Sequence, residues 1–335
     1  MYIKSAVNDN LRRIGAGFCG SVWAPPTGSQ NAHSFKREDG GPGRSVYNDY
    51  VMHQKVLSAL SMSLSANQSK VHVPGCHEYV RADNQLWWDR HLPRFPEDHQ
   101  KPCNVLVTDR IPPFPQAVRD SIINMYCPES LRPSIRASEP DRDCLIRPYL
   151  GRRRRLERQS RFNAFSLRNY PLHIDQVKEL ALPATLYARI MAETLADLYW
   201  KAHVDANDVE FVLAPPRAGR PAEPKDDGAH PSMINSHILG DHAVWLLDFD
   251  CCRDMSMDEA GVEQAAAAFC RNDPYHPRPK PGDPEIQELW EKFKERFLEA
   301  SGAILGTESP EARLPALWVE LVEGKCQPRV DAGTE

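Results

Sequence analysis

The segment that most constrains the fold is a short apolar run, residues 245–250, which ends in two acidic residues, Asp248 and Asp250. A run of this kind predicts a buried strand, and nothing next to it in the sequence neutralises the two carboxylates. Upstream, a helix with a wide apolar face is predicted from residue 183 and leads into the loop 203–205, His-Val-Asp. Acidic residues delivered by buried elements suit a site that holds a divalent metal beside a phosphate. Taken singly, such residues more often begin a turn or cap a helix.

A glycine pattern near the N-terminus reads G-x-G-x-x-G-x-V, with Gly15, Gly17, Gly20 and Val22 at its fixed positions. A dinucleotide-binding fold would place a helix directly after the glycines. Here two prolines at positions 25–26 prevent a helix from starting. We therefore expect a strand, a glycine turn and a second strand, which together form a flap whose backbone amides can approach phosphates. A plain glycine-rich hairpin turn is the alternative.

A lysine and an acid follow this flap. A short strand over residues 34–36 carries Lys36, and helical spacing of apolar residues predicts a helix from Tyr47 to Ser61 that carries Asp49 in its first half. Asp49 could therefore face Lys36. The alternative is a solvated acid at a helix start beside an unrelated surface lysine.

A buried strand over residues 105–109 ends at Asp109 and continues through Ile111 into two prolines. We take this rigid proline step after the strand as the boundary between an N-terminal part, residues 1–113, and a C-terminal part, residues 114–335. The C-terminal part contains a Pro- and Gly-rich stretch near residues 214–242 that lacks apolar periodicity, and we expect it to be an inserted surface loop.

Composition excludes several classes of protein. The net charge of −5 shows no global signature of nucleic-acid binding. No apolar run approaches the length of a membrane span and no signal peptide is recognised, so we expect a cytoplasmic protein without a membrane partner. The nine cysteines contain no C-x-x-C pair, so we expect buried or free thiols and no zinc site. The run of arginines at 152–155 is interpreted as a solvated charged turn. The alternatives are a binding site for an acidic substrate and a nuclear-import signal.

Taken in chain order, these features resemble the protein-kinase-like superfamily. The order is a glycine flap, a strand lysine, a helix acid, a buried strand with a hinge, a helix leading into His-x-Asp, and a strand leading into Asp-Phe-Asp. The resemblance covers most of the chain. It implies an α+β protein with two lobes, in which a small antiparallel sheet forms the N-terminal lobe and helices form most of the C-terminal lobe.

The resemblance also implies a nucleotide site, with ATP and Mg²⁺ as cofactors. The residues at matching positions are Gly15, Gly17, Gly20, Val22, Lys36, Asp49, Asp109 and Ile111. Lys36 would hold the α- and β-phosphates, while residues 108–111 would face the adenine. The chemistry implied is transfer of a phosphoryl group to a hydroxyl, which demands positioning and charge compensation rather than covalent work by the protein.

The matching positions in the C-terminal part are catalytic and metal-binding ones. Asp205 matches the aspartate that accepts the proton of the acceptor hydroxyl, and Asp248 matches the aspartate that binds Mg²⁺. Glu210 stands where the family usually has a second metal-binding asparagine. A carboxylate is a competent ligand for Mg²⁺, although it adds negative charge beside the triphosphate.

Several departures bear on substrate and activity. Val204 stands where protein kinases usually have an arginine in the His-Arg-Asp motif. This difference argues against regulation through a phosphorylated activation loop. Asp250 replaces a glycine, which resembles aminoglycoside- and choline-kinase-like enzymes and so favours a small-molecule acceptor. Asp49 is shorter than the usual glutamate, so a bridge to Lys36 requires the helix about 1.5 Å closer. Together these departures leave a catalytically degenerate pseudokinase, which binds nucleotide as a scaffold or regulator, as the alternative.

A second resemblance concerns three segments, residues 167–172, 244–250 and 272–279, which look like a fungal family of unknown function whose members are often labelled "zinc finger protein". This chain has no Cys2His2 spacing, so the label gains no support from its cysteines. The arginine run and the label suggest a nucleic-acid-associated regulator as a third hypothesis. We do not expect a nucleic-acid partner.

Overall fold

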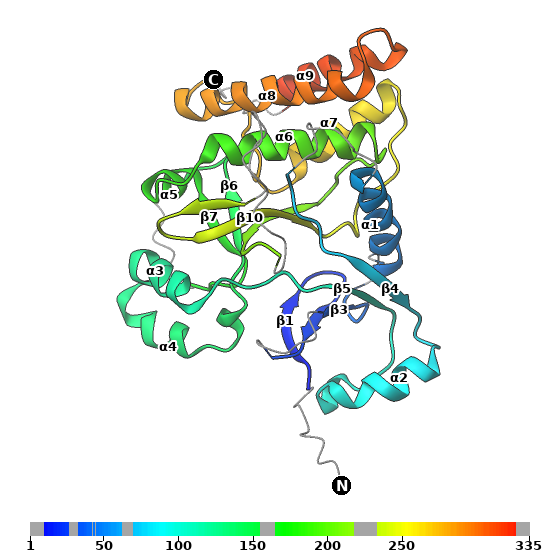
Figure 1. Cartoon of the computed structure of the whole chain (residues 1–335), viewed down its shortest axis with the longest axis vertical. Coiled ribbons are helices and arrows are strands. Elements are labelled where there is room, and N and C mark those ends of the chain that lie inside the picture. The colour runs from blue at the N-terminus through cyan, green and yellow to red at the C-terminus, as the bar shows by residue number, and fades with distance from the viewer. Residues whose placement is uncertain are drawn as a thin grey trace, which may run out of the picture.

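The computed structural model describes residues 10–26, 33–41, 43, 45–61, 70–154, 165–217 and 233–325. These residues form a mixed α+β fold with two five-stranded sheets, and each sheet is built from a different stretch of the chain. The first sheet uses strands that end before residue 110, and the second uses strands that begin after residue 145. In Figure 1 the helices α6, α8 and α9 lie together at the end of the molecule away from the first sheet.

The first sheet is antiparallel, as the alternation of short strands and turns predicts. Its strands, in spatial order, are β1 (Arg12–Ala16), β2 (Ser21–Ala24), β3 (His33–Arg37), β5 (Val105–Asp109) and β4 (Cys76–Val80). Because β1 pairs directly with β2, the glycine pattern lies in the turn of a hairpin and not at the start of a helix. The central strand β5 is rich in Val and Leu and is buried along its first three residues, as suits a strand with neighbours on both edges.

A helix and a polar insertion complete this part of the chain. Helix α1 (Val46–Ser61) packs against β4 and β5. The insertion forms α2 (Gln85–His91) and two short 3₁₀ turns, η1 (Leu92–Arg94) and η2 (Glu97–His99). Trp88 is only 1% exposed and packs in the same cluster as Trp23 and Phe95. The tryptophan pair at 87–88 therefore anchors the insertion to the back of the sheet, which is a packing role.

The second sheet is mixed. Its strands, in spatial order, are β7 (Tyr170–His173), β6 (Ile146–Tyr149), β8 (Glu210–Ala214), β10 (Gly240–Leu247) and β9 (Ile234–Ser236). Only β6 and β7 run parallel, and the remaining pairs are antiparallel. In the pairing of β8 with β10, Leu247 lies opposite Glu210, so the end of the strand that precedes Asp248 is fixed beside Glu210.

One expectation about the inserted loop is wrong. Strand β10 begins at Gly240 and pairs with β9, so residues 234–242 form a hairpin within the stretch that was expected to be an irregular loop. The turn has a residue in the left-handed region at Gly240 (φ 62°), and Asn235 donates a side-chain hydrogen bond to Asp241 at 2.7 Å. A polar hairpin of this kind carries too little apolar periodicity to be recognised in the sequence. The rest of the predicted insertion, residues 218–232, lies outside the described residues.

The C-terminal part contains most of the helices of the described residues. They are α3 (Gln116–Tyr126), α4 (Arg132–Ala137), α5 (Ile174–Glu179), α6 (Ala184–Trp200), α7 (Glu259–Arg271), α8 (Pro284–Leu305) and α9 (Leu314–Lys325), with 3₁₀ turns η3 (Glu129–Leu131), η4 (Pro140–Arg142) and η5 (Pro310–Arg313). Helix α6 is the central one, because almost every residue from Tyr187 to Trp200 is buried. A helix that is apolar nearly all round belongs inside the core.

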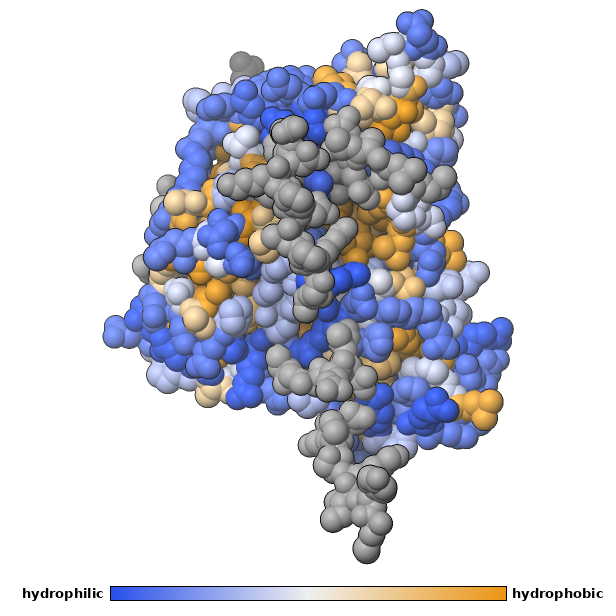
Figure 2. Space-filling model, viewed as in Figure 1, coloured by the Kyte–Doolittle hydropathy of each residue, from blue (hydrophilic) through white to orange (hydrophobic). Residues whose placement is uncertain are grey.

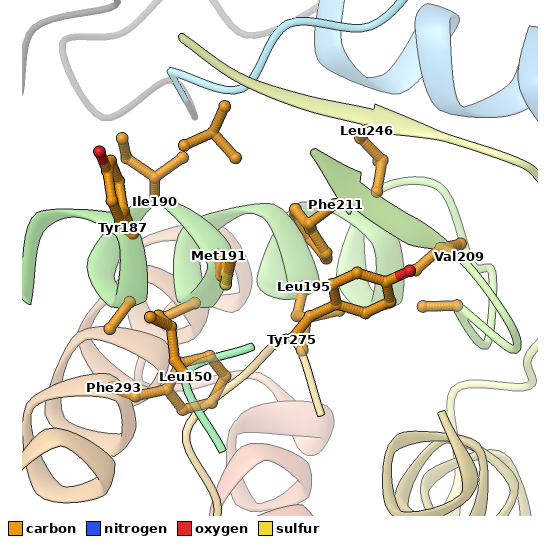
Figure 3. Packing of buried hydrophobic residues seen from close by; sticks show 14 of the residues in the cluster. Leu150, Tyr187, Ile190, Met191, Leu195, Val209, Phe211, Leu246, Tyr275 and Phe293 are labelled. Atoms are coloured by element: carbon orange, nitrogen blue, oxygen red, sulfur yellow. The ribbon is translucent and has the colours of Figure 1, made fainter. Parts of the chain in front are cut away.

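Figure 3 shows how α6 fills this core. Met191 and Leu195 point from the helix toward side chains of neighbouring elements, among them Phe211 of β8 and Tyr275. Burial of a side chain of this size contributes about 1.5–3 kcal/mol. The core therefore fixes α6 against β8 and β10, and the loop that links α6 to β8 is positioned by both.

The cysteines and arginines differ from what was expected. Of the eight cysteines in the described residues, seven carry free thiols, as predicted, but Cys270 is disulfide-bonded. Arg153 and Arg154 do not form a solvated turn, because Arg153 pairs with Asp283 at 2.8 Å and Arg154 donates a backbone hydrogen bond to Asp175 at 2.9 Å. Arg155 lies outside the described residues. These ion pairs fasten the end of β6 to the starts of α5 and α8, which is a structural use of the charge.

The surface has no extended apolar band on the face shown in Figure 2, where hydrophobic residues gather in small patches among polar ones. Among the described residues, every helix is either too short or too polar to cross a bilayer.

Candidate functional site

A cavity of about 400 Å³ opens between the first sheet and the adjoining ends of β8 and β10. Its lining includes every glycine of the flap pattern, the end of β5, and seven carboxylates from segments far apart in the sequence: Asp49, Asp109, Asp143, Asp208, Glu210, Asp248 and Asp250. A cleft of this size with a few converging polar groups is typical of a small-molecule site. Of the eleven residues predicted as site residues from the sequence, ten line this cavity: Gly15, Gly17, Gly20, Val22, Lys36, Asp49, Asp109, Ile111, Glu210 and Asp248. The eleventh, Asp205, does not.

Lys36 is the charged centre of the cavity. Its Nζ lies 2.6 Å from Asp49 Oδ2, 2.7 Å from Asp248 Oδ1 and 3.5 Å from Asp250 Oδ2. Burial works against the charge on the lysine, but the three carboxylates outweigh it and raise the pKa of Lys36 well above its ordinary value. One cation faces three acids, so the cluster carries an excess of negative charge. Burial, followed by this crowding, raises the pKa of Asp49 as well.

Helix α1 positions the loop that follows β10. Asp49 accepts a hydrogen bond from the backbone N–H of Phe249 at 3.2 Å, and Asn48 donates to the carbonyl oxygens of Asp250 and Cys252 at 2.9 Å each. Two consecutive side chains of the first turns of α1 thus hold residues 249–252 by their backbone. The shorter side chain of Asp49 still reaches Lys36, because this docking brings the helix close to the strand end.

Asp248 occupies the left-handed region, with φ 67°, which is uncommon for a residue that has a side chain. Strained backbone of this kind costs of order 1–3 kcal/mol and persists where the surroundings over-determine it. Here the β8–β10 pairing ends at Leu247 and the α1 contacts begin at Phe249, so both neighbours are fixed. The side chain of Asp248 is 34% exposed and faces the cavity.

Close backbone contacts in the glycine flap leave no room for a side chain at Gly20. Gly20 has φ 150°, and a Cβ atom there would lie 2.2 Å from the carbonyl oxygen of Arg37. The backbone N–H of the next residue, Ser21, donates to Asp39 Oδ1 at 2.7 Å, and Gly40 donates to the carbonyl oxygen of Cys19 at 3.0 Å. A Cβ at Gly17, by contrast, would meet nothing within 4 Å. Gly20 therefore shapes the turn, while Gly17 leaves the cavity side of the flap open.

The end of β5 forms the opposite wall. Thr108 and Ser34 share a hydrogen bond between their hydroxyls at 2.9 Å, and Ile111 contributes an apolar side chain. Asp109 accepts a hydrogen bond from the backbone N–H of Gly75 at 2.9 Å and lies 2.7 Å from His77 Nε2. Burial opposes ionisation of Asp109, but these two hydrogen bonds outweigh it and lower its pKa. Asp109 is therefore charged at neutral pH.

Asp205, which the resemblance places at the proton-accepting position, does not line the cavity. Its side chain is buried, and Oδ1 accepts hydrogen bonds from the backbone N–H groups of Asn207 at 3.1 Å and Arg253 at 2.9 Å. Gln264 of α7 donates to Oδ2 at 2.8 Å. Asp205 thus ties the loop after α6 to the loop after β10, and its acceptor capacity is used inside the protein.

Asp208 occupies the position that was expected of Asp205. It is exposed, lines the cavity and has φ 64°. Carboxylate oxygens of Asp208 and Asp250 and the sulfur of Cys251 lie within 4.8 Å of one another. The sequence offered one signal for this residue, namely a second acid three positions after Asp205 in the same loop. The backbone turn that aims Asp208 into the cavity is decided by tertiary contacts, such as the hydrogen bond from its N–H to Asn272 Oδ1 at 2.7 Å.

Glu210 lines the cavity but is paired with Arg147 of β6 in a short ion pair. Burial is the largest influence on Glu210, and together with nearby Asp248 it outweighs Arg147 and raises the pKa of Glu210 to about 7. Arg147 is a site residue that the sequence reasoning missed, because nothing in the run 144–150 distinguishes an arginine that enters a cavity from one that faces solvent. To act as a metal ligand, Glu210 would have to give up its ion pair with Arg147 and bind the metal ion instead.

Comparison with known proteins identifies a partial family match. Residues 244–309 match a family described as "Zinc finger protein". The matched segment includes the second half of β10, the acidic loop after it, α7 and all of α8. It contains neither the glycine flap nor Lys36. No similar protein is found among curated sequences.

Proposed function

We propose that the cavity binds ATP with Mg²⁺ and that the protein is a protein-kinase-like phosphotransferase which acts on the hydroxyl of a small molecule. The single observation that carries the proposal is the convergence of Asp49 and Asp248 on the Lys36 ammonium, beneath a glycine flap. These groups come from β3, α1 and the loop after β10, so only the folded chain brings them together. A buried lysine held between two acids suits the binding of phosphate charge beside a metal.

The donor set of the cavity fits Mg²⁺. Asp208, Asp248 and Asp250 supply carboxylate oxygens, which are the ligands that hard divalent cations prefer. The cluster holds more carboxylates than cations, so a divalent ion would relieve the repulsion among them. Bound Mg-ATP would supply the phosphoryl group and neutralise its developing charge. Lys36 would orient the phosphates, and the flap would exclude water from them.

Within this proposal Asp208 is the candidate base. It is the carboxylate of the loop before β8, residues 203–209, that lines the cavity with exposed side-chain surface, whereas Asp205 is enclosed in hydrogen bonds. A general base must come within hydrogen-bond reach of the proton it accepts. Asp205 would then act as a positioning residue that holds the loop. The choice of a small-molecule acceptor rests on Asp250, whose side chain lies beside Lys36 where a protein kinase has glycine.

A second candidate function is a nucleotide-binding scaffold without phosphoryl transfer. It is favoured by two observations, namely the enclosure of Asp205 and the ion pair of Glu210 with Arg147. In this reading the Lys36 cluster binds Mg-nucleotide, but the acceptor side of the cavity lacks a working base and a second metal ligand. The two candidates agree on binding and differ on chemistry.

Thermal denaturation with and without Mg-ATP tests the shared step. Saturating ligand at about one hundred times its Kd should stabilise the protein by about 2.7 kcal/mol. Asp248→Asn should remove this stabilisation, whereas Asp254→Asn, the same change at an exposed acid that pairs with Lys55, should keep it. No stabilisation of the wild-type protein by Mg-ATP would overturn both candidates.

Single-turnover transfer from labelled ATP to a mixture of small hydroxyl compounds separates the two candidates. The enzyme proposal expects a labelled acceptor that disappears in Asp208→Asn. Nucleotide binding with neither a labelled acceptor nor Mg-dependent release of phosphate would favour the scaffold.

A further inference from the structure

Three metal-ligating side chains meet at one end of the first sheet, outside the phosphate-facing part of the cavity. His33 begins β3, His77 lies in β4 and Asp109 ends β5, and β5 is the strand between the other two. His33 is the direct pairing partner of Asp109 across β3 and β5. A register irregularity between Cys76 and Glu78 places His77 at the same end of β4. Cross-strand neighbours of this kind present their side chains on one face.

The three side chains converge on a common point. One ligand atom from each residue lies within 4.8 Å of the other two. The rings of His33 and His77 have centroids 4.6 Å apart and are nearly perpendicular, at 79°, so the two imidazoles do not stack flat against each other. His77 Nε2 is 2.7 Å from Asp109 Oδ1. A tetrahedral ion with bonds of about 2 Å to each ligand would need only a small separation of these groups.

His33 adds an independent observation. Its Nδ1 atom is buried and has no hydrogen-bond partner among the described residues. A buried polar atom without a partner costs about 1–3 kcal/mol, and a bound ion is one way in which a folded protein satisfies such an atom. His77 and Asp109 each bring a ligand atom within 4.8 Å of a ring nitrogen of the same histidine.

The carboxylate of Asp109 is held in place through the oxygen that does not face His77. Oδ1 of Asp109 faces His77, while Oδ2 accepts the backbone N–H of Gly75 at 2.9 Å and lies 3.1 Å from Arg217 Nη2. A Cβ at Gly75 would come within 2.7 Å of Oδ2, so a glycine is required for this approach. Supporting contacts of this type orient a metal ligand and leave its other oxygen for the ion. Arg217 is the positive charge that faces the trio, and it contacts the oxygen turned away from the histidines.

We propose that His33, His77 and Asp109 form a binding site for a transition-metal dication of the Zn²⁺ type. Two imidazoles and one carboxylate are a ligand set that Zn²⁺ accepts, with a fourth position left for water or a ligand from the cavity. Mg²⁺ is not expected here, because it prefers oxygen ligands. Asp109 also lines the nucleotide-sized cavity, so an ion at this site would sit at the wall opposite the Lys36 cluster.

This site is distinct from any zinc finger. The residues that match the family described as "Zinc finger protein" are 244–309, and none of the three ligands lies among them. The cysteine spacing that argued against zinc in the sequence does not apply to ligands brought together by three strands. The proposal is also independent of phosphoryl transfer, because it requires neither ATP nor the Lys36 cluster.

Equilibrium dialysis of the full-length, metal-stripped protein against Zn²⁺ tests the proposal. We expect one tightly bound ion per chain and at least about tenfold weaker binding in His77→Ala and in Asp109→Asn. His237→Ala, the same change at an exposed histidine in the β9–β10 turn, should bind as the wild type does. Titration with Co²⁺ should give the visible absorption of a tetrahedral site in wild type and in His237→Ala, and lose it in His33→Ala.

Two outcomes would overturn the proposal. One is the absence of stoichiometric Zn²⁺ binding to a wild-type protein that melts cooperatively. The other is binding that survives in His33→Ala and His77→Ala but is lost in Cys251→Ser, which would move the ion to the Asp208, Asp250 and Cys251 group. The melting transition of each variant without metal shows whether it is folded, so a loss of binding through misfolding is recognised. Mg-ATP binding measured on the same variants reports separately on the proposed function.

Discussion

Lys36 and Asp248 are separated by 212 positions in the sequence, yet Lys36 Nζ lies 2.7 Å from Asp248 Oδ1. The contact joins the first sheet to the loop after β10, and Asp49 of α1 completes it from a third element. The proposed function depends on this convergence.

Removal of the Lys36 charge should destabilise the protein most at neutral pH. Lys36→Met leaves Asp49, which is buried, beside Asp248 and Asp250 without a cation. Breaking a buried ion pair in this way costs about 3–5 kcal/mol. Since the folded-state pKa of Asp49 is already raised and rises further without lysine, the folded variant binds more protons than its unfolded chain. The loss should therefore shrink as the pH falls toward the ordinary pKa of aspartate.

Urea denaturation at neutral and mildly acidic pH measures this loss. The double variant Lys36→Met, Asp49→Leu should lose less than the sum of its single changes, because the unpaired buried acid is gone. A penalty that does not depend on pH, together with additive single changes, would contradict the coupling.

Two glycines of the flap should respond differently to the same substitution. In Gly20→Ala the new Cβ would collide with the carbonyl oxygen of Arg37 at a backbone angle that alanine rarely adopts. In Gly17→Ala it would meet nothing within 4 Å. We expect Gly20→Ala to lose about 1–3 kcal/mol of stability and Gly17→Ala to stay within about 0.5 kcal/mol of wild type. Thermal unfolding checks both, and equal losses in the two variants would refute the assigned role of Gly20.

His276 should make the protein sensitive to acid. It is fully buried among Phe211, Phe269 and Phe293, and neither ring nitrogen has a partner among the described residues. Burial, with a smaller contribution from Arg278, lowers its pKa to about 3. The unfolded chain therefore binds a proton below about pH 6.5 that the folded protein excludes, and stability present above that pH is lost as the pH falls.

The expected size of this effect is about 2 kcal/mol between pH 7 and about pH 5. His276→Leu should reduce the acid-induced loss by that amount, since leucine does not titrate. His237→Leu, a change at an exposed histidine, should leave the pH dependence as it is. Denaturant midpoints across the pH range provide the measurement. Identical profiles for wild type and His276→Leu would count against a neutral, desolvated His276.

Substitution of Asp205 should lower the stability of the protein, whereas substitution of Asp208 should lower its activity. Asp205 accepts hydrogen bonds from Arg253, Asn207 and Gln264, so Asp205→Ala leaves buried donors unpaired and should cost about 1–3 kcal/mol. Asp208 is exposed, and Asp208→Asn, which tolerates its left-handed backbone, should leave the denaturation midpoint nearly unchanged. Under the enzyme proposal Asp208→Asn abolishes phosphoryl transfer while it keeps the fold. A stable Asp205→Ala variant that has lost transfer would return the role of base to Asp205.

Much of the local structure follows from the sequence alone, for identifiable reasons. The prolines at 25–26 decide that the glycine pattern is a hairpin, because they remove the helix that the alternative needs. The apolar face of residues 186–198 marks α6 as a core helix, and the valine-rich run at 105–109 marks a central strand. These inferences rest on backbone sterics and on periodic burial. Both act over a few residues and leave a readable pattern.

The candidate site depends on relations that such patterns do not carry. Asp205 and Asp208 share a loop and a side-chain type. Asp205 is enclosed because it accepts a hydrogen bond from Gln264 of α7, and Asp208 faces the cavity because its backbone N–H donates to Asn272. Arg147 becomes a site residue because β6 lies beside β8, and His33, His77 and Asp109 meet because β5 lies between β3 and β4. The sequence by itself determined which elements form and which residue types they carry. The packing of distant elements decided which charges share one desolvated space, because the energy of a buried charge depends on partners that only the tertiary structure supplies.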